Sequence, residues 1–207
     1  MRLIMFDMDG TLVNSSFAIT NTINYVRENI GLNKLESKFI LENLNNPSIN
    51  SAEFFYETPE FTEEQVILFE EYYNKHCISD LELYDGIEKL INDLKNDFIL
   101  AVATNSNSTY AKKMLEHVGI AQHFPTILGY DNVSNPKPHP EMIEKILNKH
   151  NILNINAQMI GDSHKDTMAA TKAGVDSLLV NWGFTDHKED AIQTIQELEQ
   201  KIIEKFN

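Results

Sequence analysis

Residues 5–12, with the sequence MFDMDGTL, constrain the fold more than any other part of the chain. They continue a short apolar run from Leu3 that predicts a buried parallel strand. Because residues i and i+2 of an extended segment point to the same side, Asp7 and Asp9 leave this strand next to each other. Two neighbouring carboxylates raise each other's pKa. The fold therefore has to bring positive charge to this strand end.

The second half of the chain alternates apolar strands with amphipathic helices. Strands are expected at residues 98–103, 126–128, 158–160 and 177–180. Helices are expected around residues 87–95, up to Gly119, from Pro140, at 167–173 and from Thr194 onward. This alternation, with short turns, predicts an α/β fold with a parallel, Rossmann-like sheet flanked by helices.

Residues 15–83 follow a different pattern, which is helical and shows no strand-like alternation. Ser15 or Ser16 is expected to cap the first of these helices. Thr62 followed by Gln65 is a capping box for another helix. The apolar stripe of that helix is Val66, Phe69, Tyr73 and Cys77. We therefore expect a small helical unit inserted after the first strand.

Length, charge and cysteine content limit the size of the core, the kinds of partner and the cellular location that the sequence predicts. The 207 residues, 42% of them apolar, suffice for one core with an insertion, and the net charge of -14 disfavours nucleic acid or anionic membrane as partners. With Cys77 as the single cysteine no internal disulfide can form, which favours a reducing, cytoplasmic location. We expect no signal peptide and no membrane span. A monomer and a homodimer fit the sequence equally well.

Four expected strand ends or loops carry polar side chains. They are Asp7 and Asp9, then Thr104 and Asn105, then Lys137, then Asp162 and Asp166. In an open parallel sheet the carboxyl ends of the strands line one crevice, where ligands bind. These residues are therefore expected to meet in space.

These residues lie in segments that resemble the four motifs of the haloacid dehalogenase-like (HAD) superfamily, in the order of that family. The segments are Asp7-x-Asp9-Gly10-Thr11, Thr104-Asn105, Lys137-Pro138 and Gly161-Asp162-Ser163-x-x-Asp166. The inserted helices resemble the C1-type cap of the superfamily. The resemblance thus implies a catalytic core of residues 1–14 and 84–207 and an α-helical cap of residues 15–83.

The resemblance implies a role for each matching residue. Asp7 would be the nucleophile that forms an aspartyl-phosphate, and Asp9 the general acid and base. The second aspartate is found in phosphatases and phosphomutases of the superfamily and is absent from its dehalogenases. The groups that bind the phosphoryl oxygens would be the Thr104 hydroxyl, the Asn105 main-chain N–H and the Lys137 ammonium.

A Mg²⁺ cofactor is also implied. Its direct ligands would be Asp7, the Met8 main-chain carbonyl and Asp162, with Asp166 bound directly or through water. Asp9 would take part only through its backbone or through water. The four aspartates and Lys137 together carry a formal charge of -3, and a divalent cation reduces it to -1. A phosphate dianion should be repelled from the site without the metal, so the cation is predicted to be obligatory.

The substrate is less constrained than the reaction. Residues 9–13, residues 130–133 and the pair Trp182-Gly183 resemble the phosphoglycolate phosphatase-like branch of the superfamily. Asn14, Ser106 and Asn132 depart from the pattern of that branch. The expected function is a Mg²⁺-dependent phosphatase for a small organic phosphate monoester. The alternatives are a sugar phosphomutase of the beta-phosphoglucomutase type and a non-catalytic binding module on a HAD core.

Overall fold

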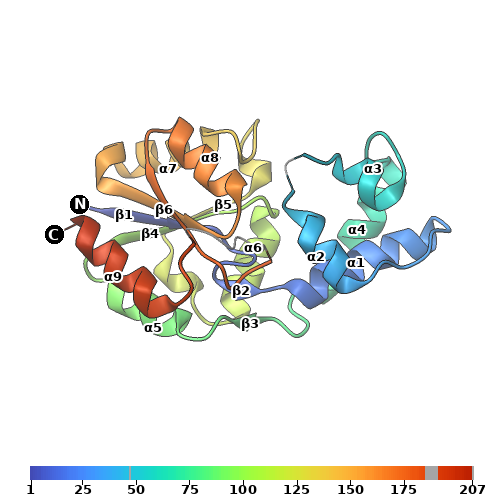
Figure 1. Cartoon of the computed structure of the whole chain (residues 1–207), viewed down its shortest axis with the longest axis horizontal. Coiled ribbons are helices and arrows are strands. Elements are labelled where there is room, and N and C mark those ends of the chain that lie inside the picture. Colours follow the sequence, from blue (N-terminus) through green and yellow to red (C-terminus); the bar gives the residue numbers. More distant parts are fainter. Residues whose placement is uncertain (47, 185–190, 207) are drawn as a thin grey trace.

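A parallel five-stranded sheet forms the centre of the larger part of the molecule (Figure 1). The computed structural model describes residues 1–46, 48–184 and 191–206. The strand order is β5-β4-β1-β6-β7. The strands are β1 (Leu3–Phe6), β4 (Ile99–Ala103), β5 (Thr126–Leu128), β6 (Ala157–Gly161) and β7 (Asp176–Leu179). The predicted parallel α/β sheet is confirmed, with the first strand at its centre.

Alternate residues of β1 face the two sides of the sheet. Ile4 and Phe6 belong to one apolar cluster, whereas Leu3 and Met5 belong to another. All four side chains are fully buried, because helices cover both faces. The helices around the sheet are α5 (Ile87–Leu94), α6 (Ser108–His117), α7 (Glu141–His150), α8 (His164–Lys172) and α9 (Ile195–Phe206). The core therefore consists of two apolar layers separated by the sheet.

The inserted segment forms four helices that lie beyond the carboxyl ends of the strands, on the side away from both termini (Figure 1). They are α1 (Ser16–Asn29), α2 (Ser37–Leu44), α3 (Ser51–Tyr56) and α4 (Glu63–His76). We call these four helices the helical unit. The capping box predicted at the start of α4 is present, since Thr62 Oγ1 accepts the Gln65 N–H and the Gln65 side chain accepts the Thr62 N–H. None of the helices in the described parts of the chain is long and apolar enough to cross a membrane.

Three local predictions are wrong. The segment up to Leu83 contains a strand, because β3 (Glu82–Leu83) pairs antiparallel with β2 (Val13–Asn14). Strands of two residues carry no periodicity, so the sequence pattern could not reveal them. Helix α8 starts at His164 rather than at residue 167, because Ser163 and Asp166 form its capping box. Val66 is 43% exposed and therefore lies outside the buried stripe predicted for α4.

The β2–β3 pair joins the helical unit to the sheet. Val13 is opposite Leu83 and Asn14 is opposite Glu82, so both chain crossings between the two parts run side by side. Helix α4 also contacts α6, since Tyr73 packs against Tyr110 and Lys113 Nζ donates to the Asn74 main-chain oxygen. Hydrogen bonds hold the two crossings together as a pair. A rotation there would open or close the space above the strand ends.

Arg27 should stabilise the helical unit from inside. This side chain is 5% exposed and donates hydrogen bonds to the main-chain oxygens of Asn33 and Phe55. Arg27→Met leaves both oxygens without these donors, so we expect the free energy of unfolding to fall by about 1–3 kcal/mol. Lys38→Met, at an exposed position of α2, is the control. Equal denaturant midpoints for the two variants would contradict this assignment.

Candidate active site

The carboxyl ends of the two central strands bring two acidic side chains together. Asp7 follows β1 and Asp162 follows β6, which pairs with β1 in register. Asp166 comes from the first turn of α8, three residues after its N-cap. Exposed fractions are 7% for Asp7, 0% for Asp162 and 1% for Asp166. One carboxylate oxygen from each of the three lies within 4.8 Å of the others.

Lys137 supplies the positive charge that the first strand end requires. Its Nζ donates to Asp7 Oδ1 at 2.7 Å and to Asp166 Oδ1 at 2.5 Å. The lysine is 4% exposed and comes from the loop before α7. The Asn105 side chain holds this loop, since it donates to the Lys137 carbonyl at 2.8 Å and accepts the Lys137 N–H at 3.0 Å. Asn105 thus helps to hold the Lys137 ammonium group between the carboxylates of Asp7 and Asp166.

Asp166 uses both carboxylate oxygens within the protein. Oδ1 accepts from Lys137, whereas Oδ2 accepts from the Ser163 N–H at 3.1 Å and the Ser163 hydroxyl at 2.9 Å. The same residue therefore caps helix α8 and belongs to the acidic cluster. Its capping role fixes the direction in which the carboxylate points.

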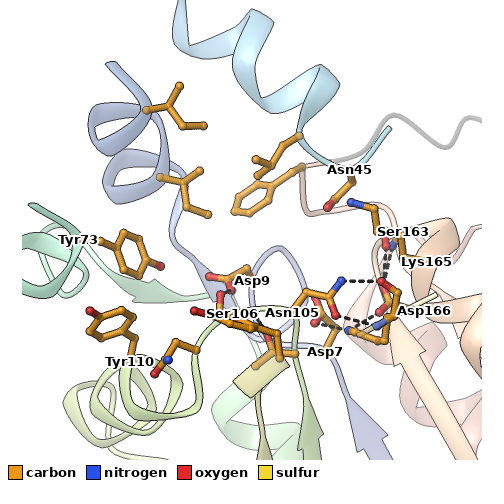
Figure 2. Close-up of a pocket in the computed structure, with 18 of the residues that line it drawn as sticks. Asp7, Asp9, Asn45, Tyr73, Asn105, Ser106, Tyr110, Ser163, Lys165 and Asp166 are labelled. Carbon is orange, nitrogen blue, oxygen red and sulfur yellow. Dashed lines mark hydrogen bonds and ion pairs between the residues drawn. The ribbon is translucent and has the colours of Figure 1, made fainter. Parts of the chain in front are cut away.

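The carboxylate of Asp9 is held apart from the acidic cluster. It accepts hydrogen bonds from the Ser15 hydroxyl at 2.5 Å and from the Ser106 hydroxyl at 2.6 Å. Figure 2 shows Ser106 next to Asp9. Sequence reasoning missed both serines as partners of Asp9. It predicted Ser15 or Ser16 as a helix cap, but the Ser15 side chain makes no capping hydrogen bond. The available signals for Ser106 were its adjacency to the Thr104-Asn105 motif and its departure from the pattern of the phosphoglycolate phosphatase-like branch.

The main-chain oxygen of Met8 is already used by the backbone. It accepts the N–H groups of Thr11, Leu12 and Val13 at 3.2, 2.9 and 3.1 Å. These bonds close the tight loop that follows β1 and direct the oxygen into it. The predicted role of this oxygen as a metal ligand therefore conflicts with the observed geometry.

A distant segment completes the site around Asp162. The N–H of Phe184 donates to Asp162 Oδ2 at 3.1 Å, and Trp182 Nε1 donates to the Thr11 main-chain oxygen at 3.1 Å. A Cβ atom placed on Gly183 would lie 2.1 Å from the Gly10 oxygen. Only glycine therefore allows this close approach of the two segments. The sequence drew attention to Trp182 and Gly183 without revealing this contact.

Burial sets the ionisation of these groups. Burial is the main cause that raises the pKa of Asp7 to about 7, against the lowering effect of Lys137, and Asp166 raises it further. Burial, together with Asp7 and Asp166, also raises the pKa of Asp162 well above its usual range. Burial raises the pKa of Asp9, and its two serine donors oppose the rise. Burial alone would lower the pKa of Lys137, but Asp166 and Asp7 raise it.

A cavity of about 290 Å³ lies between the sheet and the helical unit, and its lining includes Asp166 but not Asp162. Thr104, which is 1% exposed, lines it together with Asp7, Asp9 and Lys137. In Figure 2 the residues Ser163 and Lys165 flank Asp166, whereas Tyr73 and Tyr110 lie beyond Asp9. The cavity therefore has a charged floor from the strand ends. Its remaining walls are largely aromatic and aliphatic.

An oxygen-rich cluster of this kind fits a hard divalent cation. Carboxylate oxygens are the ligands that Mg²⁺ prefers, and three buried carboxylates near one lysine retain net negative charge. The predicted site residues, which come from distant parts of the sequence, thus lie together at the base of the cavity, at the carboxyl ends of the strands. Asp9 lies beside them with its carboxylate engaged elsewhere.

Comparisons with known proteins agree with this arrangement. The chain is 29% identical over 191 residues to the pyrophosphatase PpaX of Halalkalibacterium halodurans, covering 92% of this chain and 87% of that protein. It is 30% identical to the phosphoglycolate phosphatase of Vibrio cholerae, covering 88% and 85%. A predicted phosphatase from Clostridium acetobutylicum has a similar structure, with a TM-score of 0.86, 27% identity and 98% coverage of both chains.

The profile of one protein family covers most of the chain. It is the profile of haloacid dehalogenase-like hydrolases, and it matches residues 4–180. This range includes all the acidic residues of the site and Lys137. The resemblance predicted from the motifs is confirmed, and the chain belongs to the haloacid dehalogenase-like hydrolase family.

Proposed function

We propose that this hydrolase is a Mg²⁺-dependent phosphatase that cleaves a small organic phosphate monoester through an aspartyl-phosphate on Asp7. The observation that carries the proposal is the buried cluster of Asp7, Asp162 and Asp166 around the Lys137 ammonium, with Asp9 beside it. The relatives named phosphatases support the reaction class. Their names offer phosphoglycolate and pyrophosphate as substrates to test.

In the first step, a carboxylate oxygen of Asp7 attacks phosphorus and the ester P–O bond breaks. The electron pair of that bond goes to the departing oxygen, and Asp9 donates a proton to it. Lys137 stabilises the phosphoryl charge and holds Asp7 in position. The raised pKa of Asp9 favours the protonated form that this step uses.

In the second step, water attacks the phosphorus of the aspartyl-phosphate. Asp9, now ionised, takes a proton from the water, and the bond between phosphorus and the Asp7 oxygen breaks. Inorganic phosphate leaves and the Asp7 carboxylate is restored. The Ser15 and Ser106 hydroxyls stabilise the ionised form of Asp9 that this step requires.

Asp7, Asp162 and Asp166 would hold the Mg²⁺, with Asp9 contributing at most its main-chain oxygen. The Met8 oxygen leaves the proposed ligand set, because three N–H groups occupy it. When bound, the cation would offset the negative charge of the cluster and polarise the phosphoryl group. Asp166 is also held by Lys137 and Ser163, which supports a contact through water for this residue.

Three groups are proposed to bind the phosphoryl oxygens. Thr104 Oγ1 accepts the Ser106 N–H at 3.0 Å, which leaves the hydroxyl proton of Thr104 to donate to the phosphoryl group. The Asn105 main-chain N–H and the Lys137 ammonium complete the set. We further propose that residues 15–83 act as a cap on a core of residues 1–14 and 84–207, because residues from both parts line the cavity.

Asp9→Asn tests the acid and base role. With alkyl esters we expect kcat to fall about 10²–10⁴-fold, because the leaving oxygen receives no proton. With p-nitrophenyl phosphate, whose leaving group needs no proton, we expect a burst of one equivalent of p-nitrophenol and a trapped phosphoenzyme. Asp93→Asn on α5 is the control. Equal losses for both esters without a burst would refute the role.

Removal of divalent cations tests the metal. After chelation we expect the rate of phosphate release to fall at least about 100-fold and to recover on addition of Mg²⁺. Phosphate release from several esters without stimulation by a sugar bisphosphate excludes the mutase alternative. Full activity in the metal-free protein would contradict the proposed site.

The pKa of Asp7 predicts a pH effect on stability. Its folded value of about 7 exceeds its unfolded value of 3.8, so the folded state binds more protons between these values. The contribution of Asp7 to the free energy of unfolding therefore falls as pH rises from about 4 to 7. In metal-free protein, wild type should lose on the order of 3 kcal/mol relative to Asp7→Asn over this range. Denaturation curves at each pH measure it, and parallel pH profiles would contradict it.

A further inference from the structure

A second cavity of about 400 Å³ adjoins the first one and is lined mostly by the helical unit. Five residues line both cavities, so the two spaces adjoin each other. They are Ile23, Leu44, Phe69, Glu70 and Tyr130. We call this second space the outer cavity. A ligand whose phosphoryl group lies at Asp7 would reach the outer cavity by passing these shared residues.

The lining of the outer cavity is apolar. Beyond the shared residues it consists of Phe55, Tyr56, Phe61 and Val66, with Ser51 and Gln65. Gln65 is occupied by the capping box of α4, and Phe61 and Val66 are 54% and 43% exposed. Aromatic and aliphatic walls of this kind gain free energy when an apolar ligand removes them from water.

The charges of the lining are unevenly placed. The two ammonium groups of the first cavity, Lys137 and Lys165, come from the core and interact with the acidic cluster. Among the described residues that line the outer cavity, Glu70 is the one charged side chain. A carboxylate or phosphate placed there would meet the like charge of Glu70 and no cationic side chain among these lining residues. An ammonium group placed there would lose its hydration in an apolar space. Only the exposed Glu70 could offset this cost.

We infer that the substrate is a phosphate monoester whose alcohol part is uncharged and apolar and occupies the outer cavity. This inference rests on the proposed phosphatase activity and names the class of its substrate. It disfavours phosphoglycolate and pyrophosphate, because the leaving part of each is charged and has no apolar group to fill the outer cavity.

A series of esters tests the inference on the intact protein with Mg²⁺. From ethyl through butyl to hexyl phosphate, kcat/KM should rise about fourfold for each added methylene group until the cavity is filled. Hexyl phosphate should exceed phosphoglycolate, pyrophosphate and 6-aminohexyl phosphate. A flat alkyl series, or a preference for any of the three charged compounds, overturns the inference.

Helix α4 offers matched variants for the same test. Residues Val66, Phe69, Glu70 and Tyr73 share one helix face, because they are spaced by three and four positions. Val66→Asp should lower kcat/KM for hexyl phosphate at least about tenfold and leave ethyl phosphate within about twofold. Ile67→Asp is the control, since Ile67 is exposed and lines neither cavity. Equal effects of the two variants on hexyl phosphate overturn the inference.

A charge reversal gives a second, independent test. Glu70→Lys should raise kcat/KM for phosphoglycolate relative to ethyl phosphate, whereas Glu71→Lys, one residue further on the same helix, should not. No change in that ratio for Glu70→Lys overturns the placement of the alcohol part. If no ester of the series is hydrolysed at all, the phosphatase proposal itself fails. If phosphoglycolate is hydrolysed best, only the inference about the alcohol part fails.

Discussion

The ion pairs of Lys137 are the interaction on which the site depends. Three carboxylates lie buried within a few ångströms of one another, and like charges in so small a space oppose folding. One ammonium, 2.7 Å from Asp7 and 2.5 Å from Asp166, offsets part of this repulsion. The remaining negative charge makes the cluster receptive to a proton or a divalent cation. Stability and activity are therefore coupled through the same few charges.

The architecture explains why the two aspartates of the first motif differ. Asp7 points to the cluster that Lys137 organises, whereas Asp9 points to the hydroxyls of Ser15 and Ser106. One of these serines comes from the start of the helical unit and the other follows β4. Asp9 thus lies where the two parts of the molecule meet. A movement of the helical unit would change the partners of Asp9 and hence its readiness to exchange a proton.

Much of this arrangement could be predicted from the sequence, because it follows from local rules. The apolar run before Asp7 predicted a buried strand, and the alternation of strands and helices predicted a parallel sheet. The sheet then required that the ends of β1, β4 and β6 meet at one edge. The capping box of Thr62 and Gln65 was confirmed for the same reason, since it involves residues only three positions apart. Two-residue strands and the start of α8 were missed because a capping or pairing partner outweighs a weak pattern.

The sequence by itself determined the fold class, the family and the set of acidic residues that share one strand-end crevice. Only the tertiary structure decided which way each of these groups points. In the tertiary structure the Met8 main-chain oxygen points into the loop that follows β1, and the Asp9 carboxylate accepts hydrogen bonds from two serines. The Phe184 N–H donates a hydrogen bond to Asp162. The tertiary structure also placed the apolar cavity of the helical unit next to the cavity that Asp7 lines. The physical reason is that hydrogen-bond partners and cavities arise between segments far apart in the chain, whose packing no local spacing encodes.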